Sequence, residues 1–205
     1  MALLDDEQIT RVAQAIEEVE RHTDAELVTV LARQADDYRY IPTLWAAMIA
    51  LLSPGIVLLT PFWLDAADVL LIQLLVFFCF ALVLRAPFLL RRIIPSSVQH
   101  WRAANLARRM FLENNLHHTA GETGVLIFVS EAEHYVESIA DRGINDLVAP
   151  DAWQSIVDDM LACLRQGEVE QAFLDAIQGC GELLHQHVPH TYEKNELPNH
   201  MIVLD

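Results

Sequence analysis

The sequence predicts a small α/β sandwich, a mixed sheet with helices, that is interrupted by a two-helix transmembrane hairpin. Two observations lead to this class. Residues 41–90 form an apolar stretch long enough to cross a bilayer twice, since about 20 apolar residues cross it once. On either side, helix-like spacing of apolar residues alternates with short β-branched runs. We therefore expect residues 1–40 and 91–205, which include a C-terminal tail, to form one domain in two parts, with the hairpin at 41–90 between them.

The segment before the hairpin predicts a helix and then a strand. Ile9, Val12 and Ile16 recur every three or four positions behind an acidic start, which indicates a helix over residues 6–21. Residues 26–32 (Glu-Leu-Val-Thr-Val-Leu-Ala) are mostly aliphatic and β-branched, which is typical of a strand.

The hairpin is predicted as two spans joined by a short acidic loop. The first covers residues 41–63, and the second covers 69–84 and continues to residue 90 if Arg85 extends toward the headgroups. The alternative is a pair of buried core helices, but a soluble chain of this size has no core broad enough to surround both runs.

Charge predicts the orientation of the hairpin in the membrane. The chain has a net charge of −16, which argues against nucleic acid as a partner. Yet it has no acidic residue between Asp68 and Glu113, and arginines flank the apolar stretch on both outer sides. Because cytoplasmic flanks carry the excess of Lys and Arg, we expect a multi-pass membrane protein whose soluble domain is cytoplasmic. The basic segment after the hairpin is then expected to contact anionic lipid headgroups.

The part after the hairpin predicts a helix, two strands and two more helices. The helices are expected over residues 96–114, from 150 to just before Gly167, and from 169 to just before Pro189. The strands are expected over 125–129 and 135–141, followed by a loop over 142–149, and the tail is given no strand. A crossover between residues 32 and 125 makes the first two strands parallel, and the short link at 130–134 makes the third strand antiparallel to the second.

This topology brings polar residues to one end of the sheet, away from the hairpin. Glu122 precedes the second strand, Asp141 and Arg142 follow the third, and Asp146 and Asp151 come soon after. Clustered carboxylates suit Ca²⁺ or Mg²⁺, and an arginine near a helix start suits phosphate. The alternative is that the aspartates cap helices and Arg142 pairs with one of them on the surface.

Other possible sites give weaker signals. The spacing of His185, His187 and His190 resembles a metal cluster, but the helix dipole also favours histidine in a last turn. Ser130 follows an apolar strand without the pattern of a nucleophile elbow. The three cysteines match no zinc or redox spacing and are expected to be reduced.

Several segments together resemble the TPM domain family. They are Thr-Asp-Ala-Glu-Leu at 23–27, Thr-Gly-Val-Leu-Ile-Phe-Val-Ser at 123–130, Asp-Arg-Gly-Ile at 141–144, and the series Trp153, Ile156, Met160 and Gly167. That family includes a thylakoid acid phosphatase, a photosystem repair protein and a modulator of an acetylcholine receptor. The resemblance suggests a bacterial, membrane-anchored member of this family in the inner membrane. This chain differs from secreted members in lacking a signal peptide and in carrying its hairpin after the first strand, which places lumenal and extracellular roles in question.

Two functions follow from the residues and the resemblance. The first is a membrane-anchored binding or assembly module for other membrane proteins, which the resemblance suggests are of the LemA type, with a divalent cation as a possible ligand. The second is a metal-dependent acid phosphatase, which needs a positioned nucleophile or a metal-bound water. We favour the first, because the sequence shows carboxylates but no nucleophile beside a base.

Overall fold

The computed structural model describes residues 4–59, 61, 64–86, 88–89, 93–119, 121–191 and 201–204. The chain divides into two compact units. One joins Met1–Ala35 to His100–Asp205, and the other is Asp36–Gln99. The first unit is thus built from both ends of the sequence, and the second contains the apolar stretch.

The first unit contains a four-stranded sheet with the order β3-β2-β1-β4. Its strands are β1 (Glu26–Ala32), β2 (Gly124–Ser130), β3 (Tyr135–Ala140) and β4 (Met201–Leu204). The pairing of β1 with β2 is parallel and that of β2 with β3 is antiparallel, which confirms the predicted topology. The tail supplies a strand that was not predicted, because β4 pairs in parallel with the other edge of β1.

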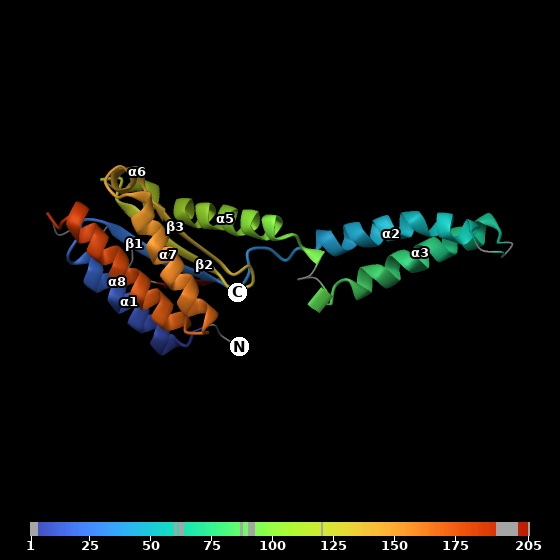
Figure 1. Cartoon of the computed structure of the whole chain (residues 1–205), viewed down its shortest axis with the longest axis horizontal. Coiled ribbons are helices and arrows are strands. Elements are labelled where there is room, and N and C mark those ends of the chain that lie inside the picture. Colours follow the sequence, from blue (N-terminus) through green and yellow to red (C-terminus); the bar gives the residue numbers. More distant parts are fainter. Residues whose placement is uncertain are drawn as a thin grey trace. The chain divides into compact units, whose positions relative to one another are not determined.

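Helices cover both faces of this sheet (Figure 1). One face packs against α1 (Asp6–Glu20), α7 (Pro150–Arg165) and α8 (Val169–His187), and the other packs against α5 (Ser96–Glu113). Strand residues alternate between the two cores: Leu27 and Leu31 face the three helices, whereas Val28 and Val30 face α5. Both β1 and β2 are therefore buried along their whole length.

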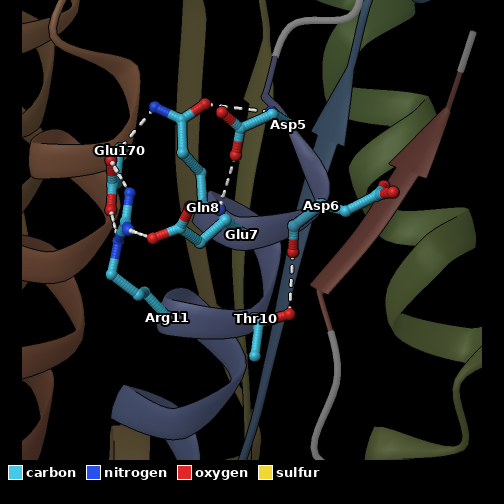
Figure 2. Close-up of polar contacts among 7 residues, drawn as sticks. All are labelled: Asp5, Asp6, Glu7, Gln8, Thr10, Arg11 and Glu170. Carbon is cyan, nitrogen blue, oxygen red and sulfur yellow. Dashed lines mark hydrogen bonds and ion pairs between the residues drawn. The ribbon is translucent and has the colours of Figure 1, made fainter.

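Polar contacts join α1 to α8 at the start of each helix (Figure 2). Asp5 and Gln8 form a capping box that satisfies the first amides of α1. Arg11 binds both Glu7 on its own helix and Glu170 on α8, and Gln8 also donates to Glu170 at 3.0 Å. The hydrogen bond between Arg11 and Glu170 raises the pKa of the guanidinium and lowers the pKa of the carboxyl.

One predicted loop contains a helix. Residues 142–149 were expected to be irregular, but Arg142–Asn145 form the short helix α6. Asp141 is its N-cap and accepts a hydrogen bond from the Arg142 amide at 2.8 Å. An aspartate at the N-cap satisfies an amide that has no partner within the helix, which explains why the turn becomes helical.

The second unit contains two apolar helices, α2 (Tyr40–Leu58) and α3 (Ala66–Val83), which pack against each other. Both are long and apolar enough to cross a membrane, by length and composition. The buried side of α2 includes the small residues Ala46, Ala50 and Ser53, which allow two helices to approach closely. The predicted span ends at Trp63 and Leu90 lie outside the described residues.

Candidate functional site

The elements that carry the predicted acidic residues meet at one end of the sheet. The Glu26 amide donates to the Thr123 carbonyl at 3.1 Å, and the Asp141 amide donates to the Gly124 carbonyl at 2.8 Å. The Gly143 amide donates to the Glu122 carbonyl at 3.0 Å. The start of β1, the start of β2 and the end of β3 are therefore bound to one another through their backbones.

Gly143 permits the closest of these approaches. A Cβ atom at this position would lie 2.3 Å from the Gly121 carbonyl oxygen and 2.8 Å from that of Glu122. Only glycine avoids this overlap, so the packing of α6 on the turn before β2 requires a glycine at position 143.

Asp141 has one carboxylate oxygen engaged and one without a partner. Its Oδ1 accepts from the Arg142 amide, whereas its Oδ2 is buried and has no hydrogen-bond partner among the described residues. A buried acceptor without a partner is energetically costly. This oxygen is the atom of the predicted site that most needs a donor, a proton or a cation.

The other predicted site residues are on the surface. Arg142, expected to bind phosphate, has its Nε 3.8 Å from Oδ2 of Asp146, and these side chains are 80% and 73% exposed. Glu122 and Asp151 are exposed as well, the latter in the first turn of α7. Within the described ranges, no three His, Cys, Asp or Glu side chains are grouped so that they could hold a metal ion. The calcium or magnesium site at Glu122, Asp141, Asp146 and Asp151 therefore stays a prediction.

The opposite end of the sheet holds a buried carboxylate that the sequence did not reveal. Glu133, in the turn between β2 and β3, is 4% exposed. It accepts hydrogen bonds from the Ser130 hydroxyl and, at 3.1 Å, from the Ala35 amide. The turn sequence gave no signal for this burial, because Glu131 and Glu133 look equivalent and only the second one turns inward.

A cavity of about 490 Å³ opens at the same end, between the strand ends and α7. Its walls include Leu31, Val129 and Leu161, with His134 and Arg165 among its polar residues. Apolar walls with a few polar groups are typical of pockets for small ligands. Ser130, one of the weaker candidates in the sequence, also lines this cavity.

A further cavity of about 510 Å³ lies between α1 and α8. Ala15, Val19 and Leu174 are among its apolar residues. Two histidines, His22 and His185, and two carboxylates, Glu18 and Glu182, also line it. Of the three histidines singled out in the sequence, only His185 belongs to this cavity, and its neighbour there, His22, comes from the end of α1.

Burial raises the pKa of one carboxyl group in the first unit, that of Glu20. Glu20, near the end of α1, accepts from the Leu27 amide at 2.9 Å, and its other oxygen is buried without a partner among the described residues. Burial raises its pKa to about 8, and the nearby charge of Glu26 adds to the shift. At neutral pH most of this carboxyl group is therefore protonated.

Comparison with known proteins agrees with this description. Residues 92–183, from the region before α5 into α8, match the family model described as the TPM domain. Among solved structures, the fold is similar to the NMR structure of BA42 protein from the psychrophilic bacterium Bizionia argentinensis. The TM-score is 0.60 at 18% identity, over 98% of this chain and 94% of that chain, a likeness that shows the fold alone. A comparison with the curated proteins finds no match. Residues 92–183 therefore match the TPM domain, in agreement with the resemblance noted in the sequence.

Proposed function

We propose that this protein is a membrane-tethered binding module, in which the α2–α3 hairpin crosses the inner membrane and the TPM-fold unit binds another membrane protein. The observation that carries the proposal is the apolar exterior of the hairpin. No residue of α3, the whole of which is described, is buried, and Leu70, Leu74 and Phe78 are each more than half exposed. Such a surface is costly in water and favourable in lipid.

The α2 side supports the same inference. Leu51, Leu52, Ile56 and Leu58 are each more than 60% exposed. A helix that is apolar on all sides needs a cover of lipid or protein on each of them. The side of α2 that carries the small residues is covered by its packing against α3. The bilayer would cover the other sides of the helix.

A tether of this kind gives a binding function without a catalytic group. A domain held beside the bilayer meets other membrane proteins at an effective concentration set by its linker, about millimolar for short flexible linkers. Small membrane proteins of the LemA type are the partners that the family resemblance suggests.

The orientation follows from the arginines on both outer sides of the hairpin and the acidic loop at Asp65 and Asp68. A reporter enzyme that works only outside the cytoplasm should be inactive when fused after Asp205. The same reporter inserted after Asp65 should be active. An active fusion at Asp205 would show that the TPM-fold unit is not cytoplasmic.

The binding function is tested by recovery of the tagged full chain from detergent extracts after crosslinking. We expect one membrane protein to be recovered in stoichiometric amount. Its recovery should survive Asp141→Asn if packing surfaces make the contact, and it should fall when the hairpin is replaced by an unrelated pair of membrane helices if α2 and α3 contribute. Recovery of no membrane protein would refute the proposal.

A metal-dependent acid phosphatase is the second candidate. The observation that favours it is Oδ2 of Asp141, which has no hydrogen-bond partner among the described residues. This oxygen could occupy one position around a cation. The described residues supply no group of three ligands that would complete such a site. Hydrolysis of phosphoserine peptides at typical enzyme rates, about 1 to 10³ per second, together with its loss in Asp141→Asn, would establish this candidate over the first.

A further inference from the structure

The rings of His22 and His185 both line the α1–α8 cavity, although 162 residues lie between them in the sequence. Their centroids are 6.5 Å apart, in an edge-to-face arrangement. His22 follows the end of α1, and His185 is in the last turn of α8. The packing of α1 on α8 is therefore what brings the two imidazoles together.

Hydrogen bonds fix which nitrogen of each ring carries the proton. The Nδ1 of His22 lies 2.8 Å from the Glu18 carbonyl oxygen, and the Nδ1 of His185 lies 3.1 Å from the His22 carbonyl oxygen. A carbonyl oxygen only accepts, so each Nδ1 must be the donor. In the neutral form of each ring, the proton is then on Nδ1 and the Nε2 lone pair is free to bind a ligand.

This is the arrangement found around histidines that bind metals. A metal-ligating histidine donates its other ring N–H to a carboxylate or a backbone carbonyl, which fixes the tautomer and makes the ligand more basic. Both rings already have such a partner before any metal is present. We propose that His22 and His185 bind a divalent transition metal such as Zn²⁺ through their Nε2 atoms, at the α1–α8 cavity.

The separation of the rings is close to what one ion requires. With Zn–N bonds of about 2.0–2.1 Å, two imidazoles on one ion have ring centres roughly 5 to 6 Å apart. The observed 6.5 Å needs a movement of about 1 Å, and both side chains are exposed enough to make it. Water would complete the coordination, because no third His, Cys, Asp or Glu side chain among the described residues is grouped with the two rings.

The types of ligand define the kind of metal. Imidazole nitrogen suits Zn²⁺, Cu²⁺ and Ni²⁺, whereas Ca²⁺ and Mg²⁺ prefer oxygen ligands. This site therefore differs in place and in metal class from the acidic end of the sheet. It also does not depend on the proposed membrane partner.

Isothermal titration of the full chain in detergent with ZnCl₂ tests the site. The parent and every variant carry Cys79→Ser and Cys163→Ser, because these two thiols would compete for zinc. Cys180 is left unchanged because it is fully buried. We expect one Zn²⁺ per chain, with binding at least 10-fold weaker in His22→Gln and in His185→Gln. Both side chains are exposed, so both variants are expected to fold.

His187→Gln is the matched control, because it changes an exposed histidine two positions further along α8 that does not line the cavity. Its affinity should stay within twofold of the parent. The proposal is overturned if the parent binds no zinc, or if His22→Gln and His185→Gln bind as tightly as His187→Gln. A second readout is the histidine ¹⁵N spectrum, in which Zn²⁺ should shift the Nε2 signals of both rings and leave Nδ1 protonated; a shift of neither signal would also overturn it.

Discussion

The Ser130 hydroxyl donates a hydrogen bond to Oε2 of Glu133, and both side chains are buried at the end of β2. The same carboxylate oxygen accepts from the Ala35 amide at 3.1 Å. One acidic side chain therefore joins the turn after β2 to the segment after β1. These two donors offset the cost of burying the carboxylate. If the carboxylate were removed, both donors would lose their acceptor.

Glu133→Ala should lower the free energy of unfolding by about 2 kcal/mol or more, since it leaves the Ser130 hydroxyl and the Ala35 amide without their acceptor. Glu131→Ala is the control, because Glu131 is exposed and lies in the same turn. It should change stability by less than about 0.5 kcal/mol. Chemical denaturation followed by circular dichroism measures both, and equal losses would show that the buried hydrogen bonds contribute little.

Glu20→Gln should make stability less dependent on pH. The pKa of Glu20 is about 8 in the folded protein, against an ordinary value of 4.5. The folded state therefore binds more protons between these values, so the free energy of unfolding of the natural protein falls as pH rises from 4.5 toward 8. Glutamine keeps an acceptor for the Leu27 amide without the charge.

The variant should be more stable than the natural protein at pH 8, by on the order of 2 kcal/mol, and close to it at pH 4.5. Thermal melts at the two pH values measure the difference. Glu182→Gln, which removes an exposed carboxylate of α8, should show no such gain. If the stability difference between Glu20→Gln and the natural protein is no larger at pH 8 than at pH 4.5, Glu20 is not protonated in the folded protein.

Gly143→Ala should destabilise the first unit by about 1–3 kcal/mol, because the new methyl group overlaps backbone oxygens that cannot move freely. Gly179→Ala is a matched change. There the added Cβ lies 3.3 Å from a side-chain atom of Ile156 and meets no backbone atom, and alanine favours the helix by about 1 kcal/mol over glycine. Denaturation midpoints compare the two variants, and a Gly143→Ala protein as stable as Gly179→Ala would contradict the close approach of α6 to the turn before β2.

Asp141→Asn should weaken any binding of Ca²⁺ more than Asp36→Asn does. Asp141 has a buried oxygen without a partner among the described residues, whereas Asp36 follows the other end of β1 and accepts from the Tyr38 amide at 2.9 Å. Isothermal titration with Ca²⁺ on the two variants measures the difference. Equal losses would remove Asp141 from the predicted site.

The local features of this protein were determined by the sequence. The apolar stretch predicted two membrane-length helices, and the strand at Glu26–Ala32 agrees in both bounds, because length, periodicity and β-branching act over a few neighbouring residues. The parallel pairing of β1 with β2 also followed from the sequence, since a long crossover leaves little choice of direction.

The tertiary structure alone decided which distant groups meet. Residues 201–204 form a strand because β1 offers them a free edge, although four residues after a polar tail carry little signal of their own. Glu133 is buried while Glu131 is exposed, and His22 meets His185 across two packed helices. Each of these outcomes depends on contacts between segments that are far apart in the chain, and the free energy of such contacts is not encoded in the pattern of either segment by itself.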